Sequence, residues 1–128
     1  MFTIKTDGLA SVPAEIHVRT ESGAGRDISI RLTGRLLSQP AWDELFQRHA
    51  GEDGNEAASL SDVYRQNARL YAETFTAWDG VCGPDGQPVP LSLAALEAAL
   101  LSVDGPAVNA ALQRAVHELR FGGAVRKN

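Results

Sequence analysis

The chain has 128 residues, of which 44% are apolar, and a formal net charge of −4, which predicts one soluble domain with a single core. It contains no apolar stretch long enough to cross a membrane, no signal-peptide pattern at its start and one cysteine, Cys82, so we expect a cytoplasmic protein without an intrachain disulfide. Residues 37–113 carry three basic and eleven acidic side chains, a net charge of −8, and such a chain lacks the clustered Lys and Arg that nucleic-acid binding needs.

The first third of the chain has the pattern of β-strands. Residues 14–19 and 27–34 alternate apolar and polar side chains, which predicts two half-buried strands. Gly23 and Gly25 lie between them and favour a hairpin turn. Residues 2–5 also alternate, and the pattern leaves open whether they join the hairpin as a third short strand. Because an isolated hairpin is marginal in water, we expect its apolar face to pack on helices.

From residue 38 onward the apolar spacing becomes helical. Four helices are expected, over residues 39–50, 60–78, 93–103 and 106–121. The sequence therefore predicts an α+β fold in one domain, residues 1–128, in which an N-terminal antiparallel hairpin packs on about four helices. Its expected parts are a β-rich part over 1–36, a helical part over 38–121 and a flexible tail over 122–128.

A short rigid loop is expected after the helix over residues 60–78. Gly80 can take a positive φ cheaply and is expected to end that helix. Pro84-Asp85-Gly86 predicts a turn. Ser92 is placed to cap the following helix with its hydroxyl, and Ser59 to cap the preceding one.

No set of residues predicts catalysis. His17, His49 and His117 are far apart in the sequence and lack the short spacing of metal ligands. Cys82 has no neighbouring base that would activate it. The acidic stretch over residues 52–56 does not follow the calcium-loop pattern, and no phosphate-binding loop occurs. We therefore expect no enzymatic activity, no cofactor and no bound metal.

Aromatic side chains at helical positions are the candidate partner-binding residues: Trp42, Tyr64, Tyr71, Phe75 and Trp78. Stripes of this kind usually face a core. The other interpretation is a partly exposed groove that accepts an amphipathic helix, since aromatic anchors dominate binding hot spots. The sequence leaves both interpretations open.

One stretch resembles a known family. Trp78-Asp79-Gly80-Val81, followed by Asp85-Gly86-Gln87-Pro88-Val89-Pro90-Leu91-Ser92, is similar to the W-D-G-V … D-G-x-P-V-P-F-S connection of tail assembly chaperones from siphophages and prophages. Residues 35–45, R-L-L-S-Q-P-A-W-D-E-L, look like the strand-to-helix junction of that family, and the resemblance spans most of the chain. Cys82-Gly83 and Leu91 depart from the family pattern.

The resemblance implies a cytoplasmic scaffold for tail morphogenesis that is absent from the mature virion. Proteins of this family bind the long, helical, aggregation-prone tape measure protein and keep it soluble until tube subunits polymerise around it. A homo-oligomer is a further expectation. The alternative is a small structural protein of the virion, a tail-completion or connector protein of a phage or prophage.

The resemblance also bears on the last residues of the chain. In lambda-like phages similar chaperones are made in two lengths by a ribosomal frameshift near the stop codon. The extension of the longer form recruits the tail tube protein. Arg126-Lys127-Asn128 can be encoded by a slippery run of adenines, so a frameshifted longer form that binds the tail tube protein is an expectation of the resemblance.

Overall fold

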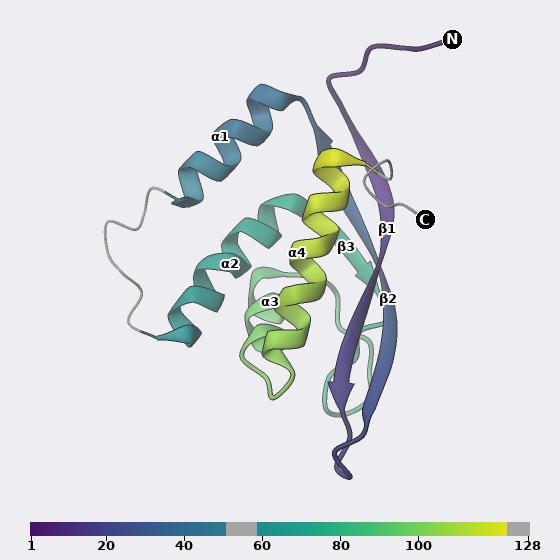
Figure 1. The fold of residues 1–128 in the computed structure, drawn as a ribbon, viewed down its shortest axis with the longest axis vertical. Coiled ribbons are helices and arrows are strands. Elements are labelled where there is room, and N and C mark those ends of the chain that lie inside the picture. The colour runs from purple at the N-terminus through teal and green to yellow at the C-terminus, as the bar shows by residue number, and fades with distance from the viewer. Residues whose placement is uncertain (51–58, 123–128) are drawn as a thin grey trace.

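The computed structural model describes residues 1–50 and 59–122 (Figure 1). Along the chain the elements are β1 (Asp7–Arg19), β2 (Gly25–Leu37), α1 (Gln39–Ala50), α2 (Leu60–Thr74), β3 (Phe75–Asp79), α3 (Leu93–Leu100) and α4 (Gly105–Phe121). The strands form one antiparallel sheet in the order β1-β2-β3, and the helices gather on one side of it. The predicted fold class, an α+β fold with an N-terminal hairpin, is confirmed. Within the described ranges no helix is both long enough and apolar enough to cross a bilayer.

The N-terminal hairpin is longer than the sequence pattern indicated. β1 and β2 have thirteen residues each and pair along their whole length, from Asp7 opposite Leu37 to Arg19 opposite Gly25. Gly23 has a φ of +91° in the turn, which glycine adopts without steric cost. The predicted strands over residues 14–19 and 27–34 are therefore the part of the hairpin nearest the turn.

The third strand and the end of the second helix differ from the prediction. Residues 2–5 lie outside the sheet, and the third strand is β3, which follows α2 without a loop. The helix expected over residues 60–78 ends at Thr74, because Phe75 is extended, with φ −103° and ψ 140°. β-branched and aromatic side chains favour a pleated sheet, and β2 offers this segment hydrogen bonds. The part over 38–121 is consequently not purely helical.

A β-bulge explains why this strand has helix-like spacing. Trp78 lies opposite Leu32 and Phe75 lies opposite Gly34, with a register shift between these two pairs. The shift leaves Thr76 as the extra residue of β3. Because Leu32 and Gly34 both face the helices, the extra residue brings Phe75 and Trp78 to the same face of the sheet. A spacing of three residues therefore places both rings on one side here, as it would in a helix.

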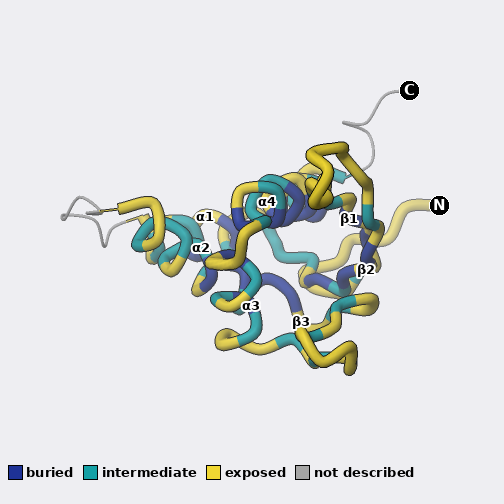
Figure 2. Tube along the Cα trace, turned by 90° about the horizontal axis from the view of Figure 1, so that it is seen from below, coloured by how far each residue is buried: buried dark blue, intermediate teal, exposed yellow. Residues whose placement is uncertain are grey.

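The core lies where the helices meet the inner face of the sheet (Figure 2). The predicted apolar stripe of α4, Val108, Leu112, Val116 and Leu119, is buried there. Gly34 of β2 allows this helix to approach, because a Cβ at that position would lie 2.2 Å from Leu119 Cδ1. α3 is shorter than predicted, and Val103 beyond its end is 92% exposed.

The loop between β3 and α3 has the predicted turn and caps. Gly80 takes a φ of +104°, although it follows a strand and not a helix. The Gly86 N–H donates to the Gly83 carbonyl over 2.9 Å, which closes the expected turn. Ser92 Oγ accepts from the Ala95 N–H at 3.0 Å and Ser59 Oγ from the Asp62 N–H at 3.1 Å, so both predicted N-caps are confirmed. The acidic stretch over 52–56 and residues 123–128 of the predicted tail lie outside the described residues.

Candidate partner-binding groove

The five aromatic residues singled out from the sequence do not form one exposed surface. Trp42, Tyr71 and Phe75 are each about 1% exposed and belong to the core. Tyr64 and Trp78 are half-buried and pack against the core from α2 and β3. The core interpretation therefore describes three of the five, and the other two lie on different elements.

A groove of about 210 Å³ lies between α1, α2 and α4. Its apolar lining is Phe46, Leu70, Tyr71, Val116 and Phe121, and its polar lining is Asn67, Gln113, His117 and Arg120. Tyr71 is the predicted aromatic that lines it. An apolar groove between helices with a polar rim is the usual form of a site that accepts an amphipathic helix.

Cation–π and aromatic contacts form one wall of this groove. The Arg120 guanidinium lies 4.8 Å from the ring centroid of Phe46 and 5.3 Å from that of Phe121. The Phe121 ring lies 4.6 Å from the His117 ring, and Arg120 Nη2 donates to Asp43 Oδ1 at 3.3 Å. Cation–π contacts at exposed sites contribute about 0.5–1 kcal/mol each. They hold Phe121, which is 51% exposed, at the mouth of the groove.

A part-buried polar network joins α2 to α4 at the floor of the groove. The Tyr71 hydroxyl donates to Asn109 Oδ1 at 2.7 Å, and Asn67 Nδ2 donates to the same oxygen at 3.0 Å. Burial, with a smaller contribution from nearby Tyr64, raises the pKa of the Tyr71 hydroxyl. The hydroxyl therefore stays protonated and remains a donor. Because each of these polar groups has a partner, the floor of the groove has one defined arrangement.

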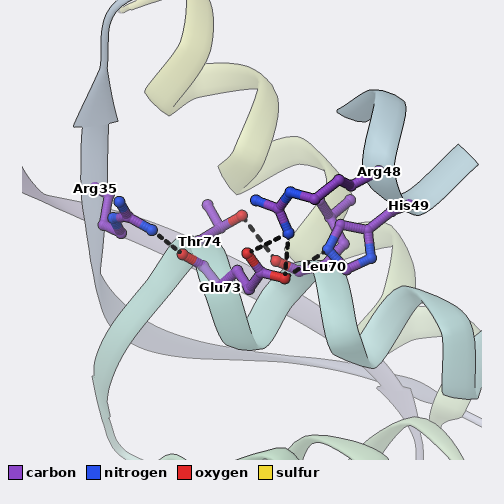
Figure 3. Close-up of polar contacts among 6 residues, drawn as sticks. All are labelled: Arg35, Arg48, His49, Leu70, Glu73 and Thr74. Atoms are coloured by element: carbon purple, nitrogen blue, oxygen red, sulfur yellow. Dashed lines mark hydrogen bonds and ion pairs between the residues drawn. The ribbon is translucent and has the colours of Figure 1, made fainter. Parts of the chain in front are cut away.

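A single carboxylate connects α1 to α2 (Figure 3). Arg48 Nη1 donates to both carboxylate oxygens of Glu73 at 3.0 Å, and His49 Nε2 lies 2.9 Å from Glu73 Oε2. Arg35 of β2 donates to the Glu73 backbone carbonyl at 3.0 Å from the other side. α1 thus carries two basic side chains onto one acidic residue of α2.

The charges around Glu73 set its ionisation. Partial desolvation would by itself raise the pKa of this carboxyl group, but the hydrogen bonds and charges of Arg48 and His49 outweigh it and lower the pKa below its ordinary value. The carboxylate is therefore ionised at neutral pH. α1 forms one wall of the groove, so its position sets the width of the groove. That position is held by the contacts of Glu73 with Arg48 and His49, by the Asp43–Arg120 contact, and by the burial of Trp42 and Leu45.

The histidines have structural partners and lie apart. His17 pairs with Asp27 in the hairpin, His49 pairs with Glu73, and the His117 ring makes a tilted contact with the Phe121 ring. In the part of the chain that the structure describes, no group of three or more His, Cys, Asp or Glu side chains is placed to hold a metal ion.

Phe121 and Arg120 are groove residues that the sequence pattern did not single out. They lie in the last turn of α4, and Phe121 is off the buried stripe that ends at Leu119. The signal in the sequence that could have indicated Phe121 as a groove residue was its position as an aromatic residue off the apolar stripe of an amphipathic helix. Its meaning depends on α1 lying beside the end of α4, which follows from tertiary packing.

Comparison of the chain with protein-family models, with curated proteins and with solved structures gives no match.

Proposed function

We propose that this protein is a tail assembly chaperone of a phage or prophage, which binds the tape measure protein and keeps it soluble while the tail is built. The observation that carries the proposal is the resemblance of residues 78–92 to the family connection. A long amphipathic chain exposes apolar stripes larger than soluble proteins tolerate. Many copies of a small protein with a net charge of −4 would cover these stripes and add charge repulsion between complexes.

The residues shared with the family over 78–92 hold the loop, and none of them lines the groove. The Trp78 indole donates to the Val89 carbonyl at 2.6 Å, and Val89 N–H donates to the Val81 carbonyl at 3.0 Å. Gly80 supplies the positive φ that turns the chain out of β3. These roles support a common scaffold, so we assign partner binding to the groove between α1, α2 and α4.

We infer that the occupant of the groove is one amphipathic helix of the tape measure protein, with a carboxylate beside its apolar stripe. Phe46, Leu70 and Val116 offer the apolar surface. Arg120 on the rim offers positive charge to a carboxylate, and the His117 ring offers a hydrogen-bonding group beside it, in a protein whose overall charge is negative. Weak binding of each copy suffices, because neighbouring copies on one long chain raise each other's effective concentration.

Co-expression tests the proposal. The tape measure protein encoded beside this gene is expressed alone and with this protein, and its soluble fraction is measured. We expect the soluble fraction to rise several-fold with this protein present. An equally insoluble tape measure protein in both cases, at matched expression, would overturn the proposal.

Two variants test whether the groove is the surface that binds the tape measure protein. Phe121→Ser removes the ring at the groove mouth, and Val103→Ser removes an equally apolar side chain that is 92% exposed outside the groove lining. We expect Val103→Ser to retain the solubilising effect and Phe121→Ser to lose most of it. Both variants should stay folded, with at most a loss of about 1 kcal/mol for Phe121→Ser from its cation–π contact. Equal activity of the two variants would refute the groove while leaving the chaperone proposal intact.

Purified particles distinguish the chaperone from the alternative structural protein. We expect mass spectrometry of purified particles to lack peptides of this chain. Its presence at a fixed copy number in particles would instead support a tail-completion or connector protein.

A further inference from the structure

The first six residues form an exposed arm that joins no sheet in the part of the chain that the structure describes. All of residues 1–6 are exposed and lie outside the sheet, with Phe2 86% and Ile4 84% exposed. The arm leads directly into β1 and runs away from the body of the molecule (Figure 1). Its alternating apolar side chains are the pattern of a half-buried strand. The sequence of the arm is therefore suited to pairing with a strand edge.

β1 is an edge strand, and one part of its outer edge is closed. Arg114 Nη2 of α4 donates to the Glu15 carbonyl at 2.9 Å, so this carbonyl points away from β2. Pro13, two residues earlier, has the same orientation in the ladder and has no N–H to offer. Residues 13–15 therefore cannot pair with a further strand, which is a common protection of sheet edges.

The outer edge remains open before Pro13. By the alternation of an antiparallel ladder, Asp7, Leu9 and Ser11 also direct their backbone N–H and carbonyl groups outward. In the described part of the chain, no backbone hydrogen bond from another element reaches the outer edge of these three residues. An arm of strand-like sequence thus adjoins an open edge of matching length.

We propose that two copies of this chain associate by antiparallel pairing of the arm of each copy with the open edge of β1 of the other. The pairing is symmetric, because each copy supplies one arm and one edge, as a two-fold interface requires. The two three-stranded sheets become one continuous sheet. The proposal is independent of the tape measure protein.

Charge selects the register. With Thr6 opposite Thr6 of the second copy, Lys5 lies opposite Asp7 of the second copy, and this pair occurs twice. A shift of the register by two residues in either direction also pairs the outward-pointing backbone groups. One shift places Lys5 opposite Lys5 of the second copy, and the other places Asp7 opposite Asp7 of the second copy. Opposite charges across a ladder stabilise it, whereas like charges directly opposite destabilise it.

The same register matches side-chain size on the face that the arm shares with the core. Ile4 then lies opposite Gly8 of the second copy, and Phe2 lies opposite Ala10 of the second copy. Large side chains across from small ones leave room for packing. In an extended arm, Phe2 and Ile4 point to the same face of the sheet as Ala10 and Val12, which face the helices. Pairing therefore removes these apolar side chains of the arm from water.

A charge swap tests the register. Sedimentation of the full chain over a wide concentration range measures the dimer fraction of the wild type, Lys5→Glu, Asp7→Lys and the double variant. Each single variant places like charges in contact, so we expect its dimerisation to weaken about tenfold, the factor that corresponds to 1.4 kcal/mol. The double variant restores opposite charges and regains wild-type dimerisation. A wild type that stays monomeric at every concentration, or a double variant no better than the singles, overturns the proposal.

Cross-linking tests the symmetry in a Cys82→Ser background. Thr6→Cys would face its own copy across a non-hydrogen-bonded pair, where the Cα atoms of an antiparallel ladder lie about 4.5 Å apart, within the range of a disulfide. Thr3→Cys is the matched control, since Leu9 of the second copy lies opposite it. We expect rapid oxidation of Thr6→Cys to a covalent dimer and little dimer from Thr3→Cys. Equal yields from the two variants would show that the arms do not pair in this register.

Discussion

The indole Nε1 of Trp78 donates a 2.6 Å hydrogen bond to the backbone carbonyl of Val89. The bond joins the end of β3 to the segment that precedes α3, and so closes the loop between them. The side chain is half-buried against the core. Trp78 therefore has two structural roles, a packing ring and a donor, and substitutions can separate them.

Trp78→Phe keeps an aromatic ring and removes the donor. We expect a loss of about 1 kcal/mol in the free energy of unfolding, the usual net value of one hydrogen bond. Trp78→Ala also removes the ring and should cost about 3 kcal/mol, the lower end of the range for large aromatic truncations because the ring is only half-buried. Urea unfolding followed by circular dichroism measures both. A Trp78→Ala variant as stable as the wild type would contradict the packing role.

Gly105, the first residue of α4, is required by a close backbone contact. A Cβ at this position would lie 2.1 Å from the Leu100 carbonyl oxygen, and backbone cannot move aside as a flexible side chain can. We expect Gly105→Ala to destabilise the protein by about 2–3 kcal/mol, as overpacking does. Gly25→Ala is the control, since a Cβ there meets nothing within 4 Å, and its melting temperature should not fall. Similar melts for the two variants would disprove the contact.

Glu73 makes the contact between α1 and α2 depend on pH. Its pKa is lowered in the folded protein, so the carboxylate stabilises the fold above the unfolded value of about 4.3. This contribution is lost as the pH falls through the lower folded value. We expect Glu73→Gln to cost no more than about 1 kcal/mol at pH 7, because the group is more than a third exposed and is screened by solvent.

The pH dependence supplies the check on Glu73. The difference in unfolding free energy between wild type and Glu73→Gln should shrink as the pH falls below about 4, and it should also shrink at high salt. Glu44→Gln on the exposed side of α1 is the matched control for the removal of one carboxylate. A difference that stays constant from pH 7 to pH 3 would mean that the ion pairs with Arg48 and His49 do not stabilise the fold.

The network beneath the groove predicts unequal effects for its members. Tyr71→Phe removes one donor, while Asn109 Oδ1 still accepts from Asn67, so we expect a loss of about 1 kcal/mol. Asn109→Ala removes the Oδ1 acceptor of both donors: the Tyr71 hydroxyl keeps only the Asn109 backbone carbonyl, at 3.4 Å, and the Asn67 amide loses this partner. It should therefore cost more, about 2–3 kcal/mol. Chemical denaturation of both variants measures the order. The reverse order would show that the Asn109 backbone carbonyl serves the Tyr71 hydroxyl as well as Oδ1 does.

Local patterns predicted most of the elements. The alternation around Ile28 and Ile30 predicted the hairpin, and the stripe of α4 from Val108 to Leu119 predicted a buried helix. Positive φ at Gly80 and the caps at Ser59 and Ser92 also follow from residue chemistry alone. These features depend on neighbours in the sequence, so local composition suffices to predict them.

Tertiary pairing decided the rest. The segment from Phe75 to Trp78 fits a helical stripe and a bulged strand equally well by spacing. β2 decides between them, because its residues Leu32 and Gly34 lie opposite Trp78 and Phe75 and pair with this segment. The groove likewise depends on α1 lying beside the end of α4, where Arg120 meets Phe46. The sequence by itself determined the hairpin, the turn, the caps and the α4 stripe, because these arise from local backbone preference and periodicity. The strand β3 and the groove were decided by the tertiary structure, because their stabilising contacts join residues far apart in the chain.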